Sequence, residues 1–303
     1  MRKRAMFVGL MVAVCVLAMD QPARTGPPVQ SAKPLKLKVF ISVDMEGISG
    51  IVTADEADEK AADDYQYFRK IMTLEAGAAV EGALAAGAKE IWVRDAHGTG
   101  RNILPDLLDK NAKLLRDWTY GPKSMMEGID ASFDAAIFIG YHAKAGTPDA
   151  TIEHTMSDSV TDMSINGVSL PEGGFNALIA GLYSVPVVFA SGDRALCEQI
   201  KGLLGEIETV AVKEGIGGAT LCLNPEVSRE KIKAGVEKAL RSPGKYKPYK
   251  MNPPYTLVLK LKDESTVEKG LFYPGVKRTG EWELTYTSND LLDILKAFSY
   301  TRR

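Results

Sequence analysis

The chain has 303 residues, of which 45% are hydrophobic and 25% are charged, so it is long enough for one large globular domain or two smaller ones. Its 37 basic and 39 acidic residues nearly cancel. This balance excludes a global electrostatic field built for nucleic acid or for an anionic membrane surface, and it favours a small or peptidic partner.

The first residues have the order of a secretory signal. Three basic residues (2–4) precede an apolar run (5–19) that is too short for a comfortable membrane span. Small residues fit cleavage after Ala18 or Ala23. We therefore assign residues 1–23 to a signal peptide and expect an exported protein, periplasmic or extracellular, with no stable membrane insertion after processing. An uncleaved anchor is the alternative.

Residues 24–34 continue a stretch rich in Pro, Ala, Ser and Gly, which has too little apolar surface to offset the entropy of ordering it. We interpret this segment as a flexible linker. After processing, Cys197 and Cys222 are the cysteines that remain. A disulfide between them is possible in an oxidising compartment, but two cysteines do not make a disulfide scaffold, so the fold must depend on its core.

Short apolar runs alternate with helical segments between residues 35 and 245. The runs that we expect to form strands are Leu37–Val43, Glu90–Arg94, Ala135–Gly140 and Val185–Ala190. Helical spacing is found in Tyr65–Ala86 and in Arg194–Leu204. This alternation predicts an α/β catalytic domain with a mostly parallel sheet flanked by helices.

A different pattern follows in the last part of the chain. Asn166-Gly167 within Thr161–Leu170 predicts a β-hairpin, and the Pro- and Lys-rich segment Ser242–Pro254 predicts a linker or a long crossing loop. Strands at Tyr255–Lys262 and Glu281–Thr287 and a helix at Asp290–Tyr300 then predict a smaller α+β subdomain over residues 246–303.

Polar side chains that can bind metal follow three of the expected strands. Asp44 and Glu46 follow the first strand, His97 follows the second, and His142 follows the strand at Ala135–Gly140. Open α/β sheets place their ligand sites outside the carboxyl ends of the strands, so these side chains can converge on one crevice. The third histidine of the chain, His154, lies in the same part of the sequence.

Mixed carboxylate and imidazole ligation suits zinc first, and also manganese or cobalt. Asp44 and Glu46 lie two residues apart, so they can point to the same side of an extended chain. The set offers more ligands than one zinc site uses, which makes a pair of metal ions bridged by a carboxylate plausible. Each residue also has an ordinary interpretation, a helix or turn cap for an acid and a structural hydrogen bond for a histidine. Asp95 either orients a ligand or is a turn residue.

Several segments resemble the motifs of one known family. They are residues 42–50 (SVDMEGISG), 95–97 (DAH), 140–143 (GYHA), 153–156 (EHTM) and 172–177 (EGGFNA). In order and spacing they resemble the D-aminopeptidase family of dizinc metallopeptidases. The resemblance runs from about Leu37 to Pro225 and more loosely to the C-terminus.

The resemblance implies two zinc ions per chain and a ring-like homo-oligomer. The metal ligands that it implies are Asp44 as the bridge, Glu46 and His97 on one ion, and His142 and Glu172 on the other. Without it, Glu172 would be interpreted as a first-turn helix acid. His154 would be the catalytic histidine, acting either in proton transfer or as the attacking group. The sequence departs from the family in its signal segment and in residues 149–152.

The expected function is therefore that of a zinc-dependent aminopeptidase that hydrolyses short peptides containing D-amino acids through a dizinc-activated water. One alternative is another dimetal amidase or a phosphoesterase, which would need cationic groups for its substrate; Lys144 is the one adjacent to a motif. Another alternative is a non-enzymatic exported metal-binding protein, in which His154 would be dispensable.

Overall fold

The computed structural model describes residues 37–302, so the predicted signal peptide (1–23) and linker (24–34) lie outside the described residues. The main sheet has seven strands in the order β3-β2-β1-β4-β7-β8-β9. Its strands are β1 (Lys38–Val43), β2 (Glu90–Asp95), β3 (Ala112–Leu115), β4 (Ala135–Tyr141), β7 (Val187–Asp193), β8 (Glu208–Ile216) and β9 (Ala219–Cys222). All neighbouring strands are parallel except β8 and β9. The predicted α/β class is confirmed.

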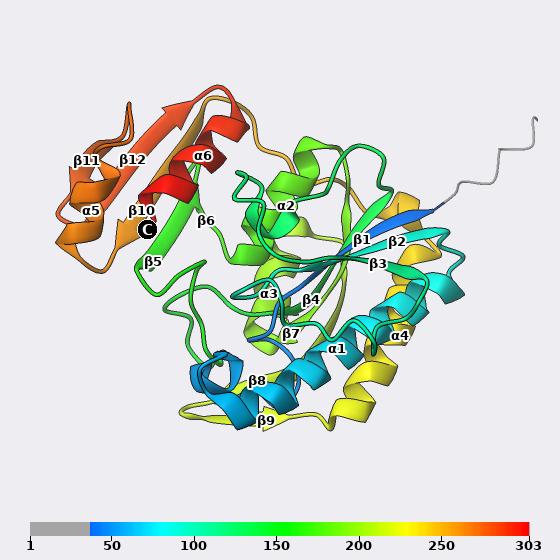
Figure 1. Ribbon diagram of the computed structural model, residues 1–303. Helices are drawn as coiled ribbons and strands as arrows, with labels where there is room; N and C mark the ends of the chain where they lie inside the picture. Colours follow the sequence, from blue (N-terminus) through cyan, green and yellow to red (C-terminus); the bar gives the residue numbers. More distant parts are fainter. Residues whose placement is uncertain (1–36, 303) are drawn as a thin grey trace, which may run out of the picture. The chain divides into compact units, whose positions relative to one another are not determined.

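Helices cover both faces of this sheet (Figure 1). They are α1 (Ala62–Ala85) and α4 (Pro225–Leu240) on one face, and α2 (Glu172–Leu182) and α3 (Arg194–Leu204) on the other. Val39 and Ile41 of β1 pack in the core cluster that includes α1 and α4, whereas Phe40 packs in the cluster that includes α2 and α3. Burial on both faces explains why these strands are continuous apolar runs.

A second, antiparallel sheet has five strands in the order β11-β12-β10-β5-β6. Its elements, with two flanking helices, are β5 (Val160–Ile165), β6 (Val168–Ser169), β10 (Tyr255–Leu261), α5 (Glu264–Gly270), β11 (Lys277–Gly280), β12 (Glu283–Ser288) and α6 (Leu291–Thr301). The predicted hairpin is β5-β6, with Asn166 and Gly167 at positive φ in its turn. This sheet joins the hairpin to strands that come after the Ser242–Pro254 segment. The proposed subdomain boundary at residue 246 stays a prediction.

Several elements were not expected from the sequence: β3, α4, α5, β11 and the β8-β9 hairpin. Helix α4 begins at Pro225, and its N-cap Asn224 accepts a hydrogen bond from the Glu226 N–H. Short 3-10 helices occur at Ala54–Ala57, Ser124–Met126 and Pro243–Lys245. No helix within residues 37–302 is long and apolar enough to cross a membrane.

The considered disulfide is absent from the described part of the chain, because Cys197 and Cys222 are both free. Cys197 is buried in α3, and this burial raises the pKa of its thiol to about 12. A thiol of this kind packs as a small apolar side chain and is a poor nucleophile.

The order of the main sheet creates a switch point between β1 and β4. From β1 the chain adds β2 and β3 on one side, and it then returns to add β4 and β7 on the other side. Connections leave in opposite directions at such a point, so a crevice opens at the carboxyl ends of β1 and β4. The segments that follow these two strands carry Asp44, Glu46 and His142.

Candidate metal centre

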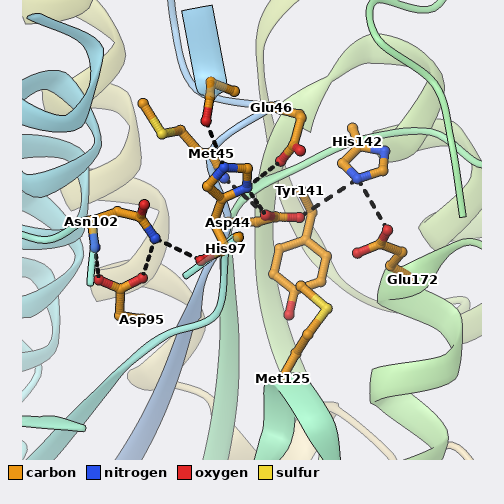
Figure 2. A network of polar contacts seen from close by, with 12 residues as sticks. Asp44, Met45, Glu46, Asp95, His97, Asn102, Met125, Tyr141, His142 and Glu172 are labelled. Atoms are coloured by element: carbon orange, nitrogen blue, oxygen red, sulfur yellow. Dashed lines mark hydrogen bonds and ion pairs between the residues drawn. The ribbon is translucent and has the colours of Figure 1, made fainter. Parts of the chain in front are cut away.

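Asp44 and Glu46 lie in a tight loop that directly follows β1. The Asp44 N–H donates to the Ile139 carbonyl and the Gly47 N–H donates to the Gly140 carbonyl, both at 2.8 Å. These bonds hold the loop against the end of β4, so both acids are buried beside that strand (Figure 2).

Two glycines allow this close approach. A Cβ atom at Gly47 would lie 1.8 Å from the Tyr141 carbonyl oxygen, and one at Gly140 would lie 2.3 Å from the Asp44 carbonyl oxygen. Gly140 also has φ +70°, a conformation that glycine adopts without strain. The glycines in both motifs are therefore required by the backbone contact that positions the acids.

Asp44 lies between two histidines. His97 Nδ1 is 3.4 Å from Asp44 Oδ1 and 2.9 Å from Glu46 Oε2. His142 Nε2 is 3.6 Å from Asp44 Oδ2 and 3.3 Å from Glu172 Oε1. Glu172 begins α2, so the first turn of that helix completes the set (Figure 2). The two oxygens of Asp44 thus face two separate groups of donors.

A backbone carbonyl orients each histidine ring. His97 Nε2 lies 2.9 Å from the Ala57 oxygen, and His142 Nδ1 lies 2.9 Å from the Ala143 oxygen. Only a protonated ring nitrogen can donate to a carbonyl, so in the neutral rings the other nitrogen presents its lone pair to the carboxylates. Metal-binding histidines are oriented in this way.

The cluster contains buried polar atoms with no hydrogen-bond partner among the described residues. They are Asp44 Oδ2, Glu46 Oε2 and His142 Nε2. Buried polar atoms without a hydrogen bond are rare in folded proteins and call for a further partner such as an ion. Here the atoms belong to the two groups of donors around Asp44, and they fit divalent metal ions.

The charges of the cluster lead to the same conclusion. Burial and the neighbouring Glu46 raise the pKa of Asp44 to about 8. Burial opposes the charging of His142, but the carboxylates of Glu172 and Asp44 outweigh it and raise the pKa of His142 to about 10. Burial also opposes the charging of Glu172, yet the adjacent His142 lowers the pKa of that carboxyl. The carboxylates therefore need positive charge, which bound divalent cations supply with the histidines neutral.

His154 lies at the edge of the same cluster. Its Nδ1 is 3.0 Å from the Ile152 oxygen, and its Nε2 is 3.5 Å from Glu172 Oε1 and 3.8 Å from Glu46 Oε1. Its ring stacks on that of His142, with 4.0 Å between the ring centroids. His154, His142 and Glu172 could themselves hold an ion, as could Asp44, Glu46 and His142. The geometry thus allows His154 to be a proton carrier or a ligand.

A cavity of about 330 Å³ opens onto these residues. One wall is the segment between β3 and β4, and another side is lined by Ser299 and Arg302 near the end of α6. Arg302 Nη1 donates to the Met156 carbonyl at 3.0 Å, beside the His154 motif. The sequence motifs did not identify these wall residues, because they come from a loop and a C-terminal helix with no recognisable signature.

Two buried charged residues lie behind the metal loop and were also missed. Lys213 of β8 donates from Nζ to the carbonyl oxygens of Glu46 and Ile51, the latter at 2.7 Å. Glu75 of α1 accepts hydrogen bonds from the N–H and the hydroxyl of Ser49. Both residues hold the loop by its backbone. A lysine in a strand and a glutamate in a helix carry no sequence signal for this role.

Two residues considered from the sequence have other partners. Asp95 accepts from the N–H groups of Asn102 and Ile103, and Asn102 Nδ2 donates to the His97 carbonyl at 2.6 Å. Asp95 therefore orders the turn that carries His97 without touching its ring (Figure 2). The Lys144 ammonium donates to Ser169 at 2.6 Å, and Lys144 does not line the cavity.

Comparisons with known proteins agree with this arrangement. A family model described as D-aminopeptidase matches residues 37–300. A D-aminopeptidase of Bacillus subtilis is 33% identical over 265 residues, which cover 86% of this chain and 95% of the relative. The solved structure of the zinc-dependent D-aminopeptidase DppA of Bacillus subtilis, described as a self-compartmentalizing protease, superposes with a TM-score of 0.83 at 31% identity and covers 88% of this chain and 96% of that one. The chain belongs to the D-aminopeptidase family.

Proposed function

We propose that this protein is a zinc-dependent aminopeptidase that hydrolyses short peptides containing D-amino acids. The observation that carries the proposal is the convergence of carboxylates and oriented histidines on both oxygens of Asp44, at the base of a cavity. The relative with a solved structure is described as zinc-dependent, which supports zinc as the metal.

The donors divide into two groups that fit two ions. Asp44 would bridge, with Glu46 and His97 on one ion and His142 and Glu172 on the other. Bound zinc would supply Lewis acidity for the scissile carbonyl and for water. The protein holds the ligands in place through the Lys213 and Glu75 contacts to the loop and through the carbonyls that orient the rings.

We assign proton transfer to His154. Its Nδ1 faces a carbonyl, so Nδ1 carries the proton in the neutral ring and Nε2 can take a proton on the side that faces Glu172. A positioned group of this kind is needed to deliver a proton to the leaving amine.

The test is an assay of the purified protein with and without zinc on D-Ala-D-Ala, its L counterpart and a phosphate ester. We expect zinc-dependent cleavage of the D-peptide. Preferred cleavage of the phosphate ester would indicate a phosphoesterase, and zinc binding without turnover of any substrate would indicate a metal-binding protein.

Metal analysis belongs to the same experiment. We expect about two ions per chain in the wild type, loss of both in Asp44→Ala and loss of mainly one in Glu172→Ala. At most one ion per chain after reconstitution with excess zinc would contradict the bridged site.

We also propose export, with removal of residues 1–23, and assembly into a ring-like homo-oligomer. The first proposal is supported by the basic and apolar order of the N-terminal sequence, and N-terminal sequencing of protein from a secreting host tests it. The second is supported by the description of the solved relative as self-compartmentalizing.

A further inference from the structure

The segment between β3 and β4 forms a wall of the cavity that has no part in holding metal. Residues 118–121, 124, 125 and 127 of this segment line the cavity. Asp117, Tyr120 and Ser124 have positive φ values of 65°, 59° and 50°, although none is a glycine. Strained backbone of this kind persists only where the surroundings hold it, and it is common at ligand sites.

Glu127 is the acidic residue of this wall. The other carboxylates that line the cavity, those of Asp44, Glu46 and Glu172, belong to the metal cluster. Glu127 Oε1 accepts the Lys123 N–H at 3.0 Å and lies so close to Gly121 that a Cβ atom there would be 2.2 Å away. Glycine at position 121 thus leaves room for the carboxylate against the loop.

The second oxygen of Glu127 is available to a ligand. Within the described part of the chain, Oε2 has no hydrogen bond, and its ion pair with Lys123 Nζ is long, at 4.0 Å, because that ammonium donates to the Ile129 carbonyl. The charge of Arg94 also attracts Glu127, but the guanidinium donates to the Asp117 carbonyl and forms no close ion pair with Glu127 within the described residues. Loop contacts therefore satisfy one oxygen and leave the other with a long ion pair and no hydrogen bond, so that it can accept one from a ligand.

The substrate of an aminopeptidase brings a positive charge that the metal centre does not favour. Three carboxylates around two divalent ions would leave a formal charge of plus one before the water loses its proton, and this charge would repel a peptide ammonium that enters beside them. A fourth carboxylate in the same partly enclosed cavity compensates that charge and prefers a cationic group to a neutral one.

We propose that Glu127 binds the free α-ammonium group of the peptide and thereby selects substrates by their unblocked amino terminus. The inference rests on the proposed aminopeptidase function and names a recognition group that the metal motifs do not contain. In this role Glu127 determines specificity. The metal ligands and His154 keep the roles that the proposed function gives them.

Glu127→Gln separates recognition from a purely structural role. The glutamine carbonyl can still accept the Lys123 N–H, so the loop contact is retained while the charge is lost. The probes are D-alaninamide and D-lactamide, which differ in having an amine or a hydroxyl next to the same amide. Their inhibition constants are measured by competition against cleavage of D-Ala-D-Ala, and also as dissociation constants by calorimetry on the zinc-loaded protein.

We expect Glu127→Gln to weaken D-alaninamide binding about 10- to 100-fold, the range for a charged hydrogen bond, and to leave D-lactamide binding and zinc content unchanged. Gly121→Ala, which displaces the Glu127 carboxylate, should also weaken the binding of D-alaninamide. Glu81→Gln removes the same charge from α1, where Glu81 forms an exposed ion pair with Lys233 of α4, and it should change neither constant.

Equal weakening of both probes by Glu127→Gln would mean that Glu127 only supports the loop. Unchanged binding of both would mean that the metal ions or their ligands hold the amine. Either result overturns the proposal. Failure of the proposed function is a distinct result, because the wild type would then cleave none of the peptides and would bind neither probe.

Discussion

The orientation of single side chains determines what each histidine of the centre can do. His97, His142 and His154 each direct one ring nitrogen to a backbone carbonyl and the other toward the carboxylates. The distances differ, since His97 and His142 each approach Asp44 and one further acid, whereas His154 approaches Glu46 and Glu172 from the cavity side. Identical side chains can therefore have different roles in one cluster.

We predict that His154→Ala keeps its zinc and loses turnover by about 10² to 10⁴, because positioned acid-base groups contribute that much. Steady-state kinetics on D-Ala-D-Ala with elemental analysis of the same sample measure both quantities. The adjacent Glu153→Gln is the control and should retain most of the activity.

Loss of an ion from His154→Ala would make His154 a ligand, as its closeness to His142 and Glu172 allows. Nearly normal turnover with full metal content would make it a structural histidine.

At the scale of helices and strands, the sequence predicted the elements that have a strong local pattern. The apolar runs that became β1, β2, β4 and β7 are buried on both faces, so their composition alone identifies them. Helix α4 was missed because it presents only a few buried residues and is otherwise charged. The edge strand β3 was missed because it has four half-exposed or exposed residues and no apolar run.

The residues of the site also divide into those with a local sequence pattern and those without one. Residues that follow strands could be placed together from the rule for open α/β sheets. The residues that support or line the site could not, because Lys213, Glu75, Glu127 and Arg302 reach it from distant elements through tertiary contacts. Glu172 was identified only through the family resemblance.

The contact between α1 and the metal loop predicts a pH dependence of stability. Burial raises the pKa of Glu75 from its ordinary 4.5 to about 7, against the hydrogen bonds from Ser49. The folded protein then holds a proton that the unfolded chain loses above pH 4.5. The contribution of Glu75 to the free energy of unfolding is therefore fully present below pH 4.5. It decreases by roughly 3 kcal/mol at most as the pH rises to about 7.

We expect Glu75→Gln to remove this slope, since a neutral amide can still accept from Ser49. Urea denaturation of the metal-free wild type and variant at several pH values between 4.5 and 7 measures it. A stability difference between the two proteins that does not change with pH would contradict the assignment.

At the scale of the whole molecule, the described chain offers exposed aromatic surface. Tyr120 is 79% exposed, and it lies where the metal cavity adjoins a second hollow lined by Tyr273 and Tyr300. Aromatic side chains that gather around one hollow are typical of a surface that another molecule covers.

We predict a homo-oligomer in solution at micromolar concentration, measured by sedimentation or by light scattering after gel filtration of the mature protein. If this hollow lies between copies, Tyr300→Glu should lower the molar mass without changing the zinc content. A monomeric wild type would contradict the proposed assembly.

The position of Asp44 between neighbouring strands has a consequence for the order of events during folding. Donors from β1, β2, β4 and α2 come together only after those strands have been aligned over long sequence separations. Loop closure must precede their meeting, so zinc has a complete site to bind only late on the folding pathway. Bound zinc would then slow the unfolding of the central sheet, and the folding rate would stay that of the metal-free chain.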